Sequence, residues 1–360
     1  DCYSIFMVSS LYMFALSQFI DLFMKSDDEN EFTYGSLFLV LLAGCQKCAS
    51  VIKHRKSIIH LTNVLSNDLC KPRNSDEMKI QSDCERDARF NALWYSSLIG
   101  GTVALVTVKS LFTDIRGRTM PFKGWLPYDH KSSAISFWVK YIHQLIANAT
   151  GGAIHSTFDT LVPGFMMQTC AQMKILKYRI ETLPQIVEAR TTSLCEQNYE
   201  GPVRERQSLE AELLMDCIKH HVQIFQFADI LNDIFSNVVL LQFALSTLIL
   251  CVSAYETSGV KIFSSEWTAL IMFLICMVIQ IFLYCFYGGE MTLESLDISN
   301  AVYRMDISLL TIRTKKNLLM IMMRALQPIV FTCGNVITVS LDSFNSIIKL
   351  SYSIYNVLQR

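Results

Sequence analysis

The sequence predicts an all-α membrane protein with seven transmembrane helices, because the chain is strongly apolar and contains seven long apolar segments. Hydrophobic residues make up 51% of the 360 residues, charged residues only 18%, and the mean hydropathy is +0.32. A soluble domain carries about a quarter charged residues, so this balance is typical of a polytopic membrane protein. The formal net charge of −1 does not suggest nucleic acid as a partner, and none is expected.

Each of the seven apolar segments is long enough to cross a bilayer, which takes about 20 helical residues. They cover residues 3–24, 32–51, 90–108, 133–165, 234–255, 262–287 and 334–358. Polar residues lie within these segments or at their edges, among them Gln18, Asp21, Lys47, Lys109, Lys140 and Lys349. Because a helix surrounded by lipid avoids such residues, we expect the spans to pack against one another or to face water. The chain begins with Asp1 and shows no cleavable signal peptide, so we expect a short segment to precede it.

Basic residues indicate the orientation of the spans. Lys and Arg are concentrated within 53–89, 174–206 and 304–324, which all lie on one side. The opposite side holds Lys25, a group between 116 and 131, and Lys261, and its first loop is mostly acidic. The positive-inside rule therefore predicts a cytoplasmic N-terminus and an extracellular C-terminus. A G-protein-coupled receptor, the alternative class with seven helices, would need the opposite orientation.

The cytoplasmic side is expected to carry long helices. Residues 209–225 have apolar side chains at helical spacing and are predicted to continue the fifth span beyond the membrane. Residues 306–324 contain no Gly or Pro but are too basic to span, so we predict a cytoplasmic helix ahead of the last span. The segments of about 174–233 and 288–328 would thus form anchor helices that pack between the subunits of an assembly.

The residues that could support catalysis or metal binding do not form a suitable pattern. Cys45 and Cys48 make a lone C-x-x-C motif without a second pair of ligands, and we interpret them as small packing residues. His155, in the fourth segment, is expected to be a satisfied core or pocket residue. His220 and His221 are expected at a solvated or interfacial position. We therefore predict neither an enzyme nor a bound cofactor.

The final apolar segment has a stripe of polar and small side chains along one helix face. Spacings of three and four residues connect Ser343, Ser346, Leu350, Ser353 and Val357. The opposite side carries mostly Phe344, Ile347, Ile348 and Tyr355. One such face cannot enclose a pore, but a symmetric ring of several chains can, and a ring of Val357 side chains could close it by dewetting. The alternative is that the polar stripe only packs against neighbouring helices.

The last quarter of the chain contains a series of motifs in a specific order and spacing. They are Tyr284-Cys-Phe-Tyr-Gly-Gly-Glu290, Ser295, Ala301-Val-Tyr303, Arg324-Ala-Leu-Gln-Pro328, Val339-Ser-Leu-Asp-Ser-Phe344 and Ser351-Tyr-Ser353. In these motifs the chain resembles the insect odorant receptors, and its length, number of spans and orientation fit that family. It departs from the family in Met305, where these receptors often carry Trp, and in Gly288-Gly289, where they usually carry a single Gly.

The resemblance implies an odour-tuned subunit of a ligand-gated, non-selective cation channel that passes Na⁺, K⁺ and Ca²⁺. Such channels are tetramers around one pore lined by the last helix, and odour-tuned subunits join a shared coreceptor in the plasma membrane of olfactory neuron dendrites. The chain lacks the coreceptor's long insertion between spans four and five. When the chain is aligned on 339–344, Val357 falls at the hydrophobic gate and Asn356 at the adjacent constriction. The expected pore residues are Ser346, Lys349, Ser353, Ile354, Asn356 and Val357.

The resemblance also places a ligand pocket among the outer halves of the spans at 32–51, 90–108, 133–165 and 262–287. The expected lining residues are Tyr34, Phe38, Gly101, Phe137, Trp138, Tyr141, Ile142, Leu145, Met272, Phe273 and Met277. Aromatic and Met side chains make an adaptable apolar cavity with a few hydrogen-bonding groups, which suits a small, neutral, volatile molecule. The alternative for each residue is ordinary helix packing. Membrane lipid is the other expected partner.

Gustatory receptors share this architecture and are the nearest alternative. Their last helix usually ends in a Thr-Tyr and Gln-Phe signature, which Ser351-Tyr352 and Leu358-Gln359 match poorly. A secondary transporter would show inverted repeats and helices broken at mid-membrane, and the sequence contains no internal repeat.

Overall fold

The described part of the chain, in a computed structural model, is almost entirely α-helical. The structure describes residues 2–24, 31–117, 119–122, 124–125, 134–196, 202–334 and 336–359. The helices are α1 (Cys2–Met24), α2 (Glu31–Lys53), α3 (Arg55–Leu65), α4 (Ser75–Gly117), α5 (Ala134–Glu196), α6 (Pro202–Gly259), α7 (Ser265–Arg304), α8 (Ile312–Ala325) and α9 (Leu341–Leu358). A short 3-10 helix, η1 (Ile307–Leu309), precedes α8, and an antiparallel hairpin of β1 (Thr332–Cys333) and β2 (Ile337–Thr338) precedes α9.

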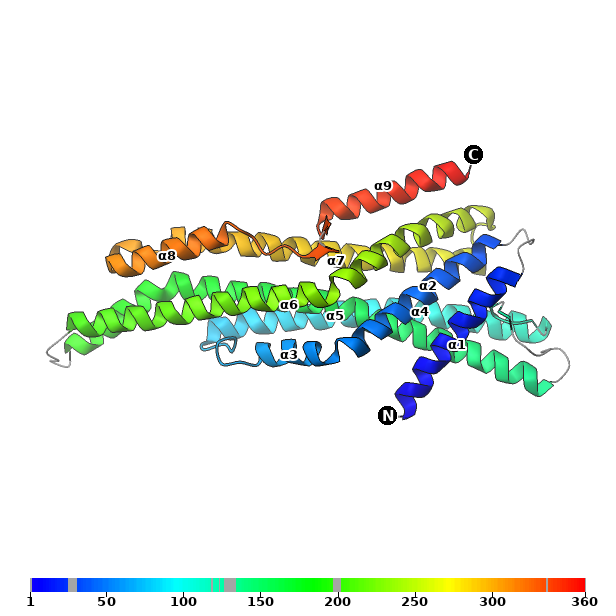
Figure 1. The fold of residues 1–360 in the computed structure, drawn as a ribbon, viewed down its shortest axis with the longest axis horizontal. Helices are drawn as coiled ribbons and strands as arrows, with labels where there is room; N and C mark the ends of the chain where they lie inside the picture. Colours follow the sequence, from blue (N-terminus) through cyan, green and yellow to red (C-terminus); the bar gives the residue numbers. More distant parts are fainter. Residues whose placement is uncertain are drawn as a thin grey trace.

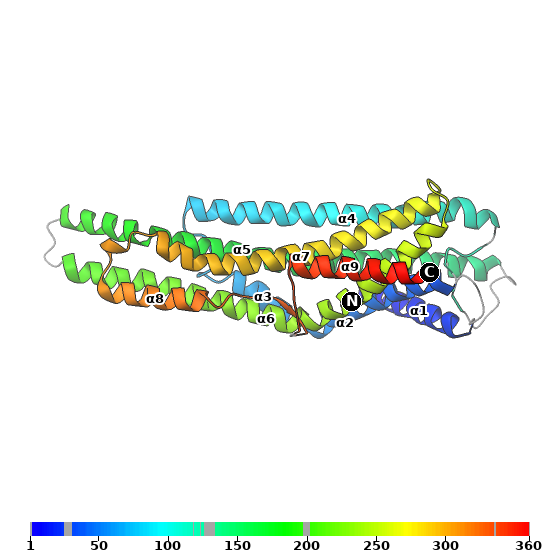
Figure 2. The ribbon, with the colours of Figure 1, turned by 90° about the horizontal axis from the view of Figure 1, so that it is seen from above.

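The helices form one elongated bundle, because several of them continue far beyond the thickness of a membrane (Figure 1). The helices α5 and α6 have 63 and 58 residues. At 1.5 Å per residue each is roughly 90 Å long, against about 30 Å for the apolar core of a bilayer. At one end, which we call the α8 end, α8 lies along α6 and α7 (Figure 2). The opposite end contains α1, α2 and most of α4.

Among the described residues, five helices contain stretches long and apolar enough to cross a membrane: α1, α2, α4, α6 and α7. The fourth predicted span lies in α5, where Lys140, His155 and Asp159 make the segment more polar. The seventh lies in α9, which has 18 residues and a polar stripe. The predicted all-α membrane architecture is confirmed. Residues 25–30 of the first predicted outer loop, and Arg118, Lys123 and Lys131 of the next, lie outside the described residues.

Two helix boundaries differ from the predictions. Residues 334 and 336–340, expected to be helical, belong to the hairpin and the connection after it, and α9 begins only at Leu341. Gly334 has a φ of +59°, in the left-handed region where a residue with a side chain is strained, so no helix runs through this position. The helix predicted for 306–324 begins at Ile312, because buried Glu210 of α6 accepts the Thr311 N–H at 3.0 Å and thereby caps α8.

Two apolar clusters hold the bundle together. The larger one runs through α5, α6, α7 and α8 and contains edge-to-face ring pairs such as Phe158 with Phe235 and Phe165 with Phe227. The smaller one joins α1 to α2 and α5 through Leu11, Phe14, Leu41, Cys45 and Ala147. Cys45, half of the C-x-x-C motif, is thus a packing residue.

Candidate functional site

Helix α9 exposes the face that carries the predicted pore residues. Five of the six predicted residues are exposed in the described chain, namely Ser346, Lys349, Ser353, Asn356 and Val357. Ile354 is half-buried. The other face packs on the larger core cluster through Phe344, Ile347 and Ile348, and Figure 1 shows α9 on the outside of the bundle. The predicted division of α9 into two faces is confirmed, while the pore-lining role of the exposed face stays a prediction.

The hairpin ahead of α9 is fixed to α6 by hydrogen bonds. The Ser236 hydroxyl donates to the Thr332 carbonyl oxygen at 2.6 Å and accepts the Gly334 N–H at 2.7 Å. The Asn232 side-chain oxygen accepts the Thr332 N–H at 2.8 Å. These bonds satisfy the polar groups of a short hairpin and set the position from which α9 starts.

The helix α7 also contacts the segment ahead of α9 closely. A Cβ atom at Gly288 would lie 2.6 Å from the carbonyl oxygen of Val339, so only glycine permits this approach. The Ser295 hydroxyl accepts the Ile329 N–H at 2.9 Å. Gly288 and Ser295 both belong to the motifs described above, and these contacts are the physical reason for the two residue types.

Some of the predicted pocket residues lie together. The rings of Phe137 and Tyr141 on α5 stack with centroids 5.9 Å apart, and the Trp138 ring packs edge-on against both. Tyr141 is buried, and its hydroxyl lies 2.9 Å from the Ser110 hydroxyl of α4. A Cβ atom at Gly101 of α4 would lie 3.9 Å from the Met272 methyl group of α7. Tyr141 of α5 therefore contacts α4 through Ser110, and in a separate contact Gly101 of α4 lies near Met272 of α7.

Other predicted pocket residues lie elsewhere. The Phe38 ring packs against Phe19 of α1 in a tilted arrangement, with centroids 5.7 Å apart. Trp138 and Ile142 are 45% and 51% exposed, on the outer side of α5. Met277 is buried in the larger core cluster, and Phe273 is partly buried against it. Leu145 is half-buried, and the side chain of Tyr34 is not described. The ten predicted residues whose side chains are described differ in burial and in the helices they contact.

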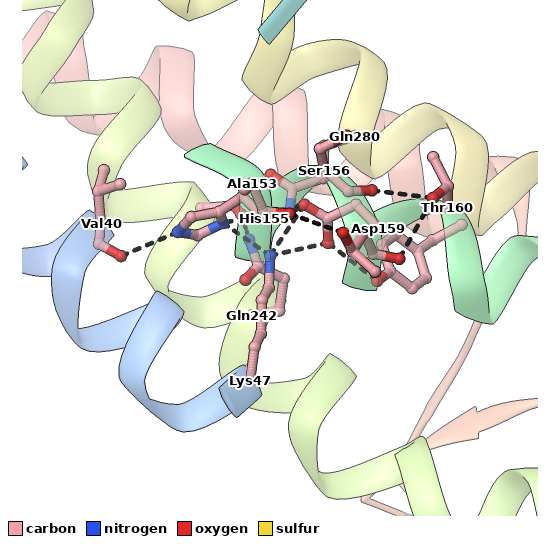
Figure 3. Close-up of polar contacts among 12 residues, drawn as sticks. Val40, Lys47, Ala153, His155, Ser156, Asp159, Thr160, Gln242 and Gln280 are labelled. Carbon is pink, nitrogen blue, oxygen red and sulfur yellow. Dashed lines mark hydrogen bonds and ion pairs between the residues drawn. The ribbon is translucent and has the colours of Figure 1, made fainter. Parts of the chain in front are cut away.

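A buried polar cluster, absent from the sequence-based predictions, lies where α2, α5 and α7 meet (Figure 3). The Lys47 ammonium donates to both oxygens of Asp159, at 2.7 and 2.9 Å, and both side chains are 0% exposed. Gln280 donates to Oδ2 at 2.6 Å and the Tyr284 hydroxyl donates to Oδ1 at 3.0 Å. Asp159 therefore accepts four hydrogen bonds from three side chains, which offset the loss of water around its charge.

His155, one helical turn before Asp159, completes this cluster. Its Nδ1 lies 2.9 Å from the Lys47 nitrogen and its Nε2 lies 3.1 Å from the Val40 carbonyl oxygen. An ammonium only donates and a carbonyl only accepts, so His155 is neutral with its proton on Nε2. Gly44 leaves room for the ring, since a Cβ atom there would lie 3.2 Å from Nε2. The prediction of a satisfied core histidine agrees with this position.

A fourth helix reaches the cluster through Tyr95 of α4, which is 1% exposed and interacts with the Asp159 carboxylate. The cluster thus connects α2, α4, α5 and α7, the four helices predicted to supply the pocket. A signal for it was present in the sequence, because Asp159 is a charged residue inside an apolar segment and such residues are expensive in a membrane.

A second buried polar cluster corrects the prediction for His220 and His221, which are 0% and 4% exposed rather than solvated. His220 Nε2 lies 2.9 Å from the Gln172 side-chain oxygen, and Nδ1 lies 3.3 Å from a guanidinium nitrogen of Arg179. Burial and then the charge of Arg179 lower the pKa of His220 to about 3. Burial and then Arg324 lower the pKa of His221 to about 4. His220 faces α5 and His221 faces α8. Their burial depends on how these distant helices pack together, and the local sequence does not reveal it.

These features define the class of protein: a helical, multi-pass membrane protein whose amphipathic terminal helix lies on the outside of a long bundle. Residues 30–352 match the sequence profile of the 7tm Odorant receptor family. The chain belongs to this family. The predicted resemblance is therefore confirmed, and with it the prediction of a receptor rather than an enzyme.

Individual relatives agree with this family. Odorant receptor 46a, isoform A, of Drosophila melanogaster is 23% identical over 316 residues, which cover 87% of this chain and 78% of the relative. Odorant receptor Or2 of Anopheles gambiae is 23% identical over 351 residues, 95% and 88% of the two chains. The solved olfactory receptor OR5 of Machilis hrabei has the same fold, with a TM-score of 0.85 at 18% identity over 99% of this chain and 88% of that one. Its structure in complex with eugenol matches with a TM-score of 0.84.

Proposed function

We propose that the chain is the odour-binding subunit of a ligand-gated, non-selective cation channel, assembled with a coreceptor into a heterotetramer. The observation that carries this proposal is the exposed face of α9, which ends in Val357 with 72% of its surface accessible. This apolar side chain at the end of a polar face is left largely uncovered by the described part of its own chain, and a symmetric arrangement of four such helices would surround an aqueous path for Na⁺, K⁺ and Ca²⁺.

The ligand of this receptor is proposed to be a small, neutral, volatile molecule. The aromatic group of Phe137, Trp138 and Tyr141, and the approach of Gly101 to Met272, favour an apolar site between α4, α5 and α7. Membership of the odorant receptor family supports the same class of ligand. The OR5 receptor with eugenol gives one example of such a molecule in a protein of this fold.

Gating is proposed to be a shift between two populations. The ligand binds more tightly to the state in which the outer ends of the α9 helices separate, and only this difference in affinity opens the channel. The Val357 side chains then withdraw and the pore fills with water. Lys349, exposed on α9, would turn either towards a neighbouring helix or into the wide cytoplasmic vestibule. A Lys349→Gln channel with normal assembly but reduced cation current would contradict the vestibule position.

The proposed function also implies a cellular location and an orientation in the membrane. It would lie in the plasma membrane of an olfactory neuron dendrite, with the N-terminus and the α8 end in the cytoplasm. The segments 174–233 and 288–328 would anchor the tetramer there. A tag at the C-terminus should be stained by antibody on intact cells. Staining only after permeabilisation would favour a G-protein-coupled receptor.

Current recording tests the channel directly. Cells expressing the chain with an insect odorant coreceptor should conduct cations when exposed to 1-octanol, ethyl hexanoate, 2-heptanone or eugenol, whereas cells expressing a chain truncated before α9 should not. A sugar or bitter panel that opens the channel, with no response to these volatiles, would favour the gustatory alternative. Absence of unitary current steps from purified, reconstituted complexes would exclude a channel.

A further inference from the structure

The buried cluster around Asp159 lies between the predicted pocket and the segments that hold α9. On α7, Gln280 follows the predicted pocket residue Met277 by one helical turn, and Tyr284 follows Gln280 by another. Figure 3 shows Lys47, His155, Asp159 and Gln280 turned toward one another from three helices. Any movement of one of these helices relative to the others must lengthen hydrogen bonds to a carboxylate that has no access to water.

We propose that Asp159 is a positioning residue for gating, which passes a change in the pocket helices to α9 through Tyr284. This inference rests on the proposed channel function. Its specific content is that the hydrogen bond from Tyr284 to Asp159 controls the balance between the closed and the open state, in addition to holding the fold together.

The path from Tyr284 to α9 consists of direct contacts. The Tyr284 ring packs edge-on against Phe243 of α6, with centroids 6.3 Å apart. One turn further along α6, the Thr247 carbonyl oxygen accepts a hydrogen bond from Ser351 of α9 at 3.3 Å. A displacement of Tyr284 therefore changes the surface of α6 on which α9 rests.

A second set of contacts runs along α7 itself. Phe282, two residues before Tyr284, packs edge-on against Phe344 in the first turn of α9 at 5.7 Å between centroids. Gly288, one turn after Tyr284, lies against Val339 just ahead of α9. This part of α7 thus contacts the first turn of α9 through Phe282 and the segment just ahead of α9 through Gly288, and Tyr284 lies between these two residues.

The charge of the cluster makes it suited to a discrete change rather than a gradual one. A buried ion pair loses more from a partial separation than an apolar contact does, because the unpaired charge remains out of water. The helices can pack in two arrangements in which the Asp159 carboxylate keeps all its hydrogen bonds. Between these two arrangements the carboxylate loses some of its hydrogen bonds, so the intermediate positions are unfavourable. Coupling between sites needs an element with two such states whose balance both sites influence.

The variant Tyr284→Phe tests this with the smallest change, since it keeps the ring against Phe243 and removes one hydroxyl. Tyr287→Phe is a matched control, because Tyr287 is one turn further on α7 and its hydroxyl bonds to Asn91 of α4 outside the cluster. Each variant is expressed with a coreceptor, its surface amount is measured by antibody, and currents are recorded without odorant and with 1-octanol, ethyl hexanoate, 2-heptanone and eugenol.

We expect Tyr284→Phe to reach the surface at a level similar to wild type and to change the half-maximal odorant concentration, or the current without odorant, by roughly fivefold or more. Tyr287→Phe should stay within about twofold of wild type in both. Equal currents and half-maximal concentrations for Tyr284→Phe and wild type, at matched surface amounts, would overturn the inference. A similar shift in Tyr287→Phe would also overturn it, because the effect would then not belong to Asp159.

A second pair of variants covers the case in which loss of the hydroxyl prevents folding. The single substitutions Lys47→Met and Asp159→Leu each leave one buried charge without its partner, whereas the double variant removes both charges. If the pair is only structural, the double variant restores surface amount and normal gating together. We expect it to restore surface amount but not gating. If the wild-type protein conducts under no condition, the proposed function is refuted together with this inference. If the wild type conducts and the variants show the same currents and half-maximal concentrations, only this inference is refuted.

Discussion

Arg179 of α5 and Glu77 of α4 form a buried ion pair with two parallel hydrogen bonds. The Arg179 Nε donates to Oε1 at 3.0 Å and Nη2 donates to Oε2 at 2.8 Å, while the side chains are 8% and 3% exposed. The guanidinium also donates to the Leu69 and Lys71 carbonyl oxygens, at 2.7 and 2.9 Å. A single side chain therefore fixes the connection between α3 and α4 to the long helix α5.

Replacing Arg179 by Lys should destabilise the receptor strongly, although the charge is kept. An ammonium cannot make the paired bonds of a guanidinium, and it leaves Glu77 and the two carbonyl oxygens without full partners. Breaking a buried ion pair costs about 3–5 kcal/mol, so the thermal midpoint of the detergent-solubilised protein should fall clearly in fluorescence-detected size-exclusion chromatography. Arg190→Lys, at an exposed position of the same helix, is the control. Equal midpoints for the two variants would show that the ion pair contributes little.

The two buried histidines should make the receptor less stable in mild acid. In the folded protein the pKa of His220 is about 3, against 6.5 for the free side chain, so this group stays neutral in the fold but gains a proton on unfolding below pH 6.5. The neutral His220 side chain therefore contributes fully to the free energy of unfolding above pH 6.5, and this contribution is lost as the pH falls from 6.5 toward 3. At pH 5.5 the loss is about 1.4 kcal/mol, and His221, with a pKa of about 4, adds to it.

Thermal midpoints of the purified protein at pH 7.5 and 5.5 measure this effect. His220→Asn should reduce the difference between the two midpoints, even if both midpoints are lower than in wild type. His60→Asn, at an exposed position of α3, should leave the difference as it is. A His220→Asn protein with the full pH dependence of wild type would assign the acid sensitivity to other groups.

The neighbouring glycines Gly288 and Gly289 should respond in opposite ways to alanine. A Cβ atom at Gly288 would meet the Val339 carbonyl oxygen at 2.6 Å and the Val339 side chain at 2.8 Å, whereas none of the described atoms lies within 4 Å of a Cβ atom at Gly289. Gly288→Ala should destabilise by about 1–3 kcal/mol through overpacking, and should lower odour-evoked current by displacing the start of α9. Gly289→Ala should stabilise by up to about 1 kcal/mol, because alanine is the better helix former.

The two variants serve as each other's controls in one thermal-shift and recording series. If both are tolerated equally, α7 can move away from Val339 at no cost, and the close approach does not position α9.

The features of α9 that depend on local periodicity could be predicted from the sequence. The spacing of Phe344, Ile347 and Ile348 identified the packed face, because a helix repeats every 3.6 residues and its neighbours in space are its neighbours in sequence. The start of the helix could not be predicted in this way. Residues 334–340 are as apolar as a span, and only the positive φ of Gly334 and the hairpin bonds to α6 show that the chain turns there.

The buried polar clusters could not be predicted, because their members are far apart in the chain. Lys47 and Asp159 are separated by 112 residues and Arg179 and Glu77 by 102, and no local pattern states which charge meets which. The burial of His220 has the same origin, since it is decided by where α5 lies against α6. The predicted pocket residues show the same limit: the described ones lie on α2, α4, α5 and α7, but local spacing does not determine which of them meet in space.

Substituting Val357 by Asn should open the proposed gate without harming the fold. Val357 is 72% exposed in the single chain, so the change should alter stability by no more than about 0.5 kcal/mol. A ring of polar side chains would keep water in a constriction that a ring of valines excludes, and cation current in the absence of odorant should rise several-fold. Val336→Asn, at an 81% exposed position ahead of α9, should leave that current unchanged. If Val357→Asn channels reach the surface in normal amounts and stay closed without odorant, the constriction lies elsewhere on the helix, and Asn356 and Ser353 become the next positions to substitute.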